Sequence, residues 1–147
     1  MTMAEPMPAE SVVHTHPVRV YYEDTDTGGV VYYANYLRFA ERARTEMLRA
    51  AGVSHSSMAE REGLAFAVRR CDAEYLKPAR LDDALNVDTG NIDLQAASLW
   101  LDQFVRRGAD VLVTMRVRLA CIDRDGRPAR LPQRLRGALQ EFQKPTS

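Results

Sequence analysis

An acidic turn followed by a long amphipathic stretch holds the residues best suited to chemistry in this chain. Asp24 and Asp26 precede Gly28 and Gly29, and apolar residues with helical spacing begin near Tyr33. Glycine reaches backbone conformations closed to other residues, so the chain can bend sharply between the carboxylates and the helix. A carboxylate facing the unpaired N–H groups of a helix start is an arrangement suited to hydrolysis.

Asp26 is the candidate catalytic group of this turn. Its carboxylate can attack an activated acyl carbon or act as a general base on water, and the sequence does not choose between these roles. The N–H groups of the helix start, together with the helix dipole, can polarise the acyl carbonyl. The alternative interpretation of Asp26 is a turn carboxylate without a catalytic role, because acidic residues before glycine are common in turns. Asp24 is interpreted as structural or supporting.

Four more residues surround the expected helix start. Tyr33 is expected to take part in catalysis, and Gly29, Val30 and Asn35 are expected to contact the substrate, with capping of the helix as the alternative for both Tyr33 and Asn35. Glu41 lies two turns further along the helix among several arginines. That setting favours an internal salt bridge over catalysis for Glu41.

Hydrophobic periodicity indicates which elements position these residues. Apolar residues at steps of three and four predict a helix from about residue 33 to 51, ended by Gly52. Alternating apolar residues predict a strand that opens at Pro17 and strands over about 64–75, 85–89, 97–105 and 111–121. A change of phase near Arg69 and Arg70 predicts a β-bulge. Consecutive strands joined by short turns pair antiparallel, so the sequence predicts an α+β fold with one sheet against the long helix.

Composition restricts the class of protein. The chain has 147 residues, 46% hydrophobic and 27% charged, which predicts a single packed domain. Residues 1–15 have little to bury and are expected to form a flexible N-terminal tail. Its 20 basic and 20 acidic residues argue against a nucleic-acid or membrane-surface binder. No transmembrane run or signal peptide is visible, so a cytoplasmic location is expected. Cys71 and Cys121 lack the spacing of metal ligands, so neither a metal nor another cofactor is expected.

Two long blocks, over 21–32 and 41–49, resemble the Tol-Pal-associated acyl-CoA thioesterases. That family belongs to the 4-hydroxybenzoyl-CoA thioesterase branch of the hotdog fold. Shorter blocks over 64–70 and 78–83 resemble it as well, and the resemblance extends over residues 16–143, which it implies to be a single hotdog thioesterase domain. It implies a hotdog fold, in which a five-stranded antiparallel sheet wraps around one long central helix.

The resemblance also implies an activity. It implies metal-free hydrolysis of acyl-CoA thioesters, with Asp26 at the position of the catalytic carboxylate. It implies homodimers with two sites at the dimer interface, often paired into homotetramers, and acyl carrier protein is considered as a second acyl donor. Tyr33 stands where many close members of the family carry His, whereas the 4-hydroxybenzoyl-CoA enzymes have Tyr there.

Two other functions are compatible with a hotdog fold. One is a non-catalytic protein that binds acyl groups or acts as a scaffold for envelope and lipid enzymes. Such a binder has no need of a carboxylate at the helix start, so Asp26 distinguishes it from a hydrolase. The other is a dehydratase or hydratase, which needs a catalytic His near the central helix, where this chain has Tyr33.

Overall fold

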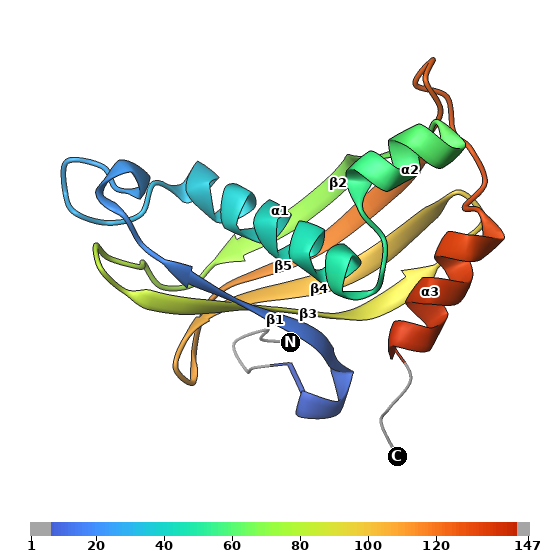
Figure 1. Ribbon diagram of the computed structural model, residues 1–147. Helices are drawn as coiled ribbons and strands as arrows, with labels where there is room; N and C mark the ends of the chain where they lie inside the picture. Colours follow the sequence, from blue (N-terminus) through green and yellow to red (C-terminus); the bar gives the residue numbers. More distant parts are fainter. Residues whose placement is uncertain (1–6, 144–147) are drawn as a thin grey trace.

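Five antiparallel strands form one curved sheet, and the longest helix lies along one face of it (Figure 1). The computed structural model describes residues 7–143. In chain order the elements are η1 (Ala9–Ser11), β1 (Val12–Arg19), η2 (Tyr22–Asp24), α1 (Tyr33–Ala50), α2 (His55–Glu62), β2 (Ala65–Tyr75), β3 (Ala84–Leu94), β4 (Ser98–Arg107), β5 (Asp110–Ile122) and α3 (Gln133–Gln143). The strands lie in the order β1-β3-β4-β5-β2, so β1 and β2 are the edges of the sheet.

The central helix α1 buries one face because its apolar residues recur at helical spacing. Phe39, Ala40 and Ala43 are fully buried, and the two small side chains let the helix approach the sheet closely. The helix packs against β1, β3 and β4. It ends before Gly52, whose φ of +85° is the left-handed conformation expected after a helix C-terminus. The predicted start and end of this helix are therefore confirmed.

A buried polar network fixes the position of α1 over the sheet. The Gln103 Nε2 group on β4 donates to the Ala40 carbonyl oxygen of the helix at 3.0 Å and to Thr89 Oγ1 on β3 at 3.1 Å. Arg44 Nη1 in turn donates to Gln103 Oε1 at 3.0 Å. Because unpaired buried polar groups are destabilising, this network favours one register of the helix.

The predicted hotdog arrangement, α+β with a five-stranded antiparallel sheet around one long helix, is confirmed. The bulge expected near Arg69 and Arg70 is confirmed too, since the register of β2 on β5 shifts between Val68 and Arg70. The strand predicted at 85–89 is longer than expected. It continues through Gly90 and Asn91 as an irregular ladder on β4.

The N-terminal boundary of the domain needs a correction. The flexible tail was expected over 1–15, but residues 9–11 form η1 and β1 begins at Val12. The two β-branched residues Val12 and Val13 open the strand, and the edge position of β1 accommodates Pro17, which lacks an N–H group. The part of the expected tail over 1–6 lies outside the described residues.

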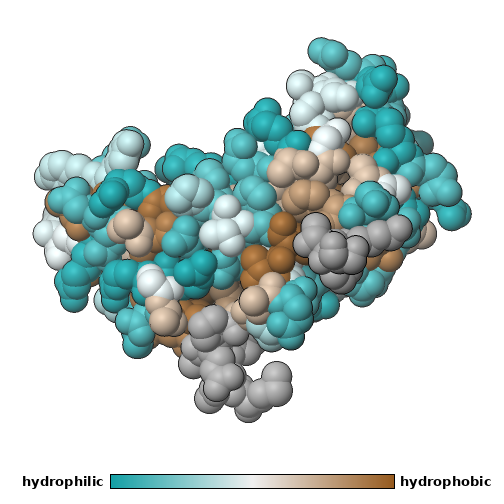
Figure 2. Space-filling model, turned by 60° about the horizontal axis from the view of Figure 1, so that its bottom comes forward, coloured by the Kyte–Doolittle hydropathy of each residue, from teal (hydrophilic) through white to brown (hydrophobic). Residues whose placement is uncertain are grey.

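The face of the sheet away from α1 carries a second, smaller apolar cluster that contains Met7, Phe104 and Val111. Figure 2 views the molecule from below, and apolar surface there is broken into patches between hydrophilic residues. None of the helices within residues 7–143 combines the length and apolar character needed to cross a membrane. Over the same range, no three His, Cys, Asp or Glu side chains lie close enough together to hold a metal ion.

Candidate active site

Asp26 lies in a tight turn that is stabilised by hydrogen bonds of the Asp26 backbone and side chain. Its N–H group donates to the Val30 carbonyl oxygen at 2.9 Å, and its carbonyl oxygen accepts from the Gly29 N–H group at 3.1 Å. Asp26 Oδ1 accepts from the Gly28 N–H group at 2.9 Å. The side chain is exposed, and within the described residues no donor contacts Oδ2. The carboxylate thus stabilises its turn with one oxygen and presents the other to solvent.

Gly29 has a φ of +77°, which an L-residue with a side chain adopts only with strain. The predicted bend therefore lies at this glycine. Thr25 and Val31 pair across the base of the turn, so the turn leads directly back towards α1.

Asp24, two residues before Asp26, is buried and fully bonded. Its Oδ2 accepts from the Tyr21 N–H group at 2.8 Å, and its Oδ1 accepts from Asn35 Nδ2 at 2.9 Å. Its carbonyl oxygen accepts from the Tyr32 N–H group at 3.1 Å. The interpretation of Asp24 as a structural residue is confirmed. The same bonds assign the buried Asn35 side chain to positioning the helix start, and its contact with substrate stays a prediction.

The N-terminus of α1 is not capped by any side chain in the described part of the chain. Tyr32 occupies the N-cap position, and the first N–H groups of an α-helix have no partners within the helix. The Asn35 N–H group donates to the Tyr32 carbonyl oxygen at 2.8 Å, so the N–H groups of Tyr33 and Ala34 are those available to an oxygen that carries negative charge.

A cavity of about 250 Å³ adjoins the helix start and is lined by Val31, Tyr33, Tyr36, Tyr75 and residues 76–78. The Tyr33 ring is 60% exposed and lies edge-on to the Tyr75 ring, with centroids 6.0 Å apart. Burial raises the pKa of the Tyr36 and Tyr75 phenols above the ordinary value for tyrosine. The mostly apolar wall suits an acyl group, and the volume is below that of a typical site for a whole cofactor-sized ligand.

A larger hollow of about 410 Å³ lies on the other side of the sheet, beside Met7, Asp88 and Arg106. Asp88 is already paired with Arg106 at 2.6 Å, and neither the acidic turn nor the helix start borders this hollow. A further hollow of about 330 Å³ reaches the acidic turn at Tyr21, Glu23 and Asp24. The smaller cavity adjoins the uncapped helix start and has the more apolar wall, so we place the candidate site there.

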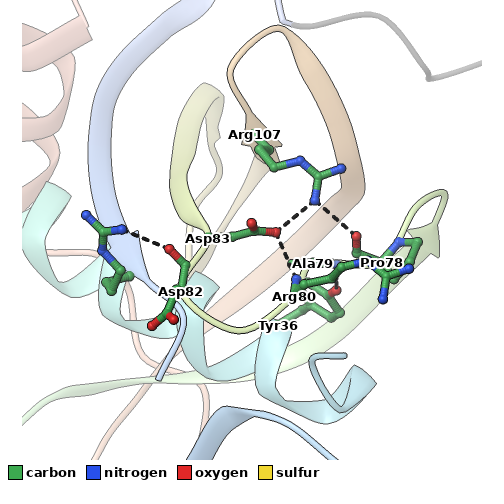
Figure 3. Close-up of polar contacts among 8 residues, drawn as sticks. Tyr36, Pro78, Ala79, Arg80, Asp82, Asp83 and Arg107 are labelled. Atoms are coloured by element: carbon green, nitrogen blue, oxygen red, sulfur yellow. Dashed lines mark hydrogen bonds and ion pairs between the residues drawn. The ribbon is translucent and has the colours of Figure 1, made fainter. Parts of the chain in front are cut away.

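A short segment, residues 78–83, covers the acidic turn, and we refer to it as the strap. The Val31 N–H group donates to the Ala79 carbonyl oxygen at 2.9 Å, and the Leu81 N–H group donates to the Gly29 carbonyl oxygen at 3.2 Å. The Ala79 N–H group donates to the Tyr36 hydroxyl at 2.9 Å (Figure 3). The strap therefore contacts both the turn and the first part of α1.

Asp83 joins the two ends of the strap. Its Oδ2 accepts from the Arg80 N–H group and from Arg107 Nη1, each at 2.8 Å, and Arg107 Nη1 also reaches the Pro78 carbonyl oxygen at 3.3 Å (Figure 3). Burial alone would raise the pKa of Asp83, but these hydrogen bonds and the charges of Arg107 and Arg80 lower it overall. Sequence patterns alone did not predict that Asp83 joins the two ends of the strap, although residues 78–83 resemble the thioesterase family.

The structure brings together most of the residues predicted for the site. Asp26, Gly29 and Val30 share one turn, and Tyr33 opens the helix next to it. Their roles in catalysis and substrate binding stay predictions. The salt bridge expected for Glu41 is not formed as a direct contact in residues 7–143, where the ion pair within α1 joins Glu46 and Arg49 at 3.3 Å. The Glu41 charge nevertheless acts on the buried Arg44, where it opposes the lowering of the pKa by burial.

Comparison with known proteins gives consistent matches over the domain. The sequence profile of the thioesterase-like superfamily matches residues 20–139. Acyl-CoA thioesterase YbgC of Haemophilus influenzae is 40% identical over 127 residues, which cover 86% of this chain and 93% of the relative. Acyl-CoA thioester hydrolase YbgC of Escherichia coli O6:H1 is 49% identical over 109 residues, or 73% of this chain and 80% of the relative. The crystal structure of a probable thioesterase from Bartonella henselae superposes with a TM-score of 0.76 at 40% identity, covering 81% of this chain and 98% of that one.

Proposed function

The chain belongs to the thioesterase-like superfamily, and from this premise we propose that it is an acyl-CoA thioesterase. It hydrolyses an acyl-CoA thioester to the free acid and CoA. The observation that carries the proposal is the position of the exposed Asp26 carboxylate in a turn that leads into the uncapped N-terminus of α1, beside an apolar cavity. Relatives that match most of the domain are named for the same reaction.

The helix start holds the thioester oxygen. In the proposed complex, the carbonyl oxygen of the thioester accepts hydrogen bonds from the first N–H groups of α1, beginning with that of Tyr33. Negative charge grows on this oxygen as the acyl carbon is attacked, and the bonds strengthen with it. Loss of one such donor raises the barrier by about 3 kcal/mol in comparable sites.

Asp26 supplies the attack in one of two ways. As a general base, it takes a proton from water while the water oxygen bonds to the acyl carbon; the C–S bond then breaks, and the leaving CoA thiolate takes up a proton. As a nucleophile, a carboxylate oxygen bonds to the acyl carbon and displaces the thiolate, and water then hydrolyses the resulting anhydride. Both routes use Asp26 Oδ2, to which no described residue donates a hydrogen bond.

The neighbouring residues have defined parts in this proposal. Gly29 and Val30 bring the backbone of the turn close to the substrate, and the Tyr33 ring forms one wall of the acyl cavity. Asn35 acts through Asp24, to which its side chain is bonded. A purely acyl-binding protein is not favoured, because it would need no exposed carboxylate at the helix start.

The proposal extends to assembly, donors and location. The chain acts as a homodimer or homotetramer, which the unpaired outer edge of β2 supports, since exposed strand edges favour pairing with another chain. Acyl-CoA is the substrate, and acyl carrier protein is a second acyl donor. The chain acts in the cytoplasm, in association with the Tol-Pal envelope system. Apart from the support that the β2 edge gives to assembly, these parts rest on the sequence resemblance.

The test is a panel of acyl-CoA substrates with detection of the free thiol, run on the wild type and on Asp26→Asn. We expect the wild type to hydrolyse at least one substrate, and Asp26→Asn to lower kcat by about 10²- to 10⁴-fold. The matched control is Asp93→Asn, which removes an exposed carboxylate at the far end of β3 and should match the wild type. Full activity in Asp26→Asn would refute the site, and an inactive wild type would refute the activity.

A further inference from the structure

The strap is hydrogen-bonded to both sides of the bend that carries the candidate chemistry. Gly29 and Val31 flank Val30, and each is bonded through its backbone to a strap residue, Leu81 or Ala79. Val30 itself pairs with Arg80 as an antiparallel bridge. The turn thus pairs with a segment about 50 residues further along the chain. A movement of the strap would therefore move the turn.

The strap is also bonded to α1. The Tyr36 hydroxyl, one turn into the helix, accepts from the Ala79 N–H group. The adjacent residues Ala79 and Arg80 therefore connect the helix start on one side and the acidic turn on the other. A shift of the strap would change the distance between the Asp26 carboxylate and the first N–H groups of α1.

Two side chains hold the strap in its curved shape. The Asp83 carboxylate accepts from the Arg80 N–H group inside the strap and from Arg107 at the end of β4, and Arg107 also contacts the Pro78 carbonyl oxygen. Figure 3 shows Asp83 and Arg107 pointing toward one another across the strap. Asp82, which precedes Asp83 in the strap, has a φ of +70°, a strained conformation for a residue other than glycine, which persists only where neighbours enforce it.

We propose that Asp83 is a positioning residue for the hydrolysis, acting through the strap to set the acidic turn against the helix start. The proposal rests on the proposed function. Asp83 does not touch the substrate; its carboxylate orders residues 78–81, and these residues order Gly29–Val31. Arg107 assists from β4 by fixing the carboxylate and the Pro78 carbonyl oxygen together.

Removal of the carboxylate should loosen the strap without detaching it. Arg19 Nη1 still donates to the Asp82 carbonyl oxygen at 2.8 Å, and the Asp82 N–H group still donates to the Val20 carbonyl oxygen at 3.0 Å. The far end of the strap therefore stays on β1 and its extension. The fold should survive, while the near end, which carries Ala79 and Arg80, gains freedom.

Three variants separate positioning from general stability. Asp83→Ala removes the acceptor for both donors and should lower kcat by about tenfold to a hundredfold with little change in KM, because misplacement of a reacting group by about 1 Å has effects of this size. Asp83→Asn keeps an oxygen for the Arg80 N–H group and should recover part of the loss. Asp82→Asn removes a neighbouring charge that makes no side-chain bond in the described residues, and it should match the wild type. Thermal melts set the assay temperature well below every midpoint.

A second measurement does not depend on activity. Hydrogen exchange of the Val31 and Leu81 N–H groups should be at least several-fold faster in Asp83→Ala than in the wild type, whereas that of Val117 in the central ladder should be unchanged. The proposal is overturned if Asp83→Ala keeps wild-type kcat, or if exchange at Val31 and Leu81 is unchanged. A wild type that hydrolyses no acyl-CoA would refute the proposed function, and with it the role of Asp83 in hydrolysis. The exchange result would still show separately whether Asp83 holds the turn in place.

Discussion

Asp24 and Asp26 belong to one acidic turn, two residues apart, and the fold gives them opposite surroundings. Asp24 is 6% exposed, and its two carboxylate oxygens accept from Tyr21 and Asn35. Asp26 is exposed, and one of its oxygens has no donor among the described residues. Residue type and sequence context are nearly the same for both. The difference in hydrogen bonding separates a carboxylate that holds structure from one available for chemistry.

The largest effect that would test this comparison is on stability. Asp24→Ala leaves the part-buried Tyr21 N–H group and the buried Asn35 amide without their acceptor, and an unsatisfied group of this kind destabilises by up to about 3 kcal/mol. We expect a decrease in the free energy of unfolding of about 2–6 kcal/mol, measured by urea denaturation. Asp26→Ala, the matched variant, should change stability by less than about 1 kcal/mol, because its single side-chain bond is exposed. Equal losses for the two would remove the distinction.

The second effect is on rate at constant charge. Asp26→Glu keeps the carboxylate but moves it by one methylene, so we expect kcat to fall by about 10²-fold, equal to about 2.7 kcal/mol in activation free energy. Steady-state kinetics on the best substrate of the acyl-CoA panel checks this. Glu23→Asp, which shortens an exposed neighbour, is the control. A fully active Asp26→Glu would favour a purely electrostatic role for the carboxylate.

The third effect concerns the link between the turn and the helix. Asn35→Ala removes the donor to Asp24 Oδ1 and leaves that buried oxygen unpaired, so we expect about 1–3 kcal/mol of destabilisation. A double-mutant cycle with Asp24→Ala should give an interaction energy of the same order, because the two side chains share one hydrogen bond. Additive losses would show that the bond does not couple them.

The smallest effect is at the bend. Gly29→Ala meets no atom within 4 Å of the added methyl group, yet its φ of +77° makes the left-handed conformation strained by about 1–2 kcal/mol. We expect a loss of stability of this size in thermal unfolding. Gly137→Ala in α3 is the matched control, and it should stabilise slightly, because alanine favours a helix and finds open space there. A neutral Gly29→Ala would mean that the turn can change its conformation.

Local patterns were sufficient to predict the frame of the molecule. The helix beginning at Tyr33, its end at Gly52 and the bulge near Arg69 and Arg70 are all encoded within a few residues, by hydrophobic spacing or by the backbone freedom of glycine. The predicted first strand began too late, because Val12 and Val13 are followed by three consecutive polar residues, His14–His16, which hide the alternation typical of a strand. Only its pairing with β3 reveals it as a strand.

The supports of the site depend on contacts between distant segments, and a single sequence gives no indication of these. Arg107 meets Asp83 because the end of β4 lies beside the strap, which follows from strand order and not from spacing along the chain. The bond between Asn35 and Asp24 spans 11 residues and a change from turn to helix. The sequence could place Asp26 and the helix start next to one another, but it could not predict what holds them there.

The uncapped start of α1 has a consequence for thermal behaviour. Tyr32 stands where Ser, Thr, Asp or Asn would add about 1 kcal/mol by accepting a bond from the helix backbone. Any anion that satisfies those N–H groups binds only the folded chain and should raise its melting temperature in proportion to the logarithm of its concentration. The form with the highest melting temperature would therefore be one in which a bound anion blocks the helix start. A Ser, Thr, Asp or Asn introduced at position 32 would occupy the same N–H groups and should inhibit hydrolysis.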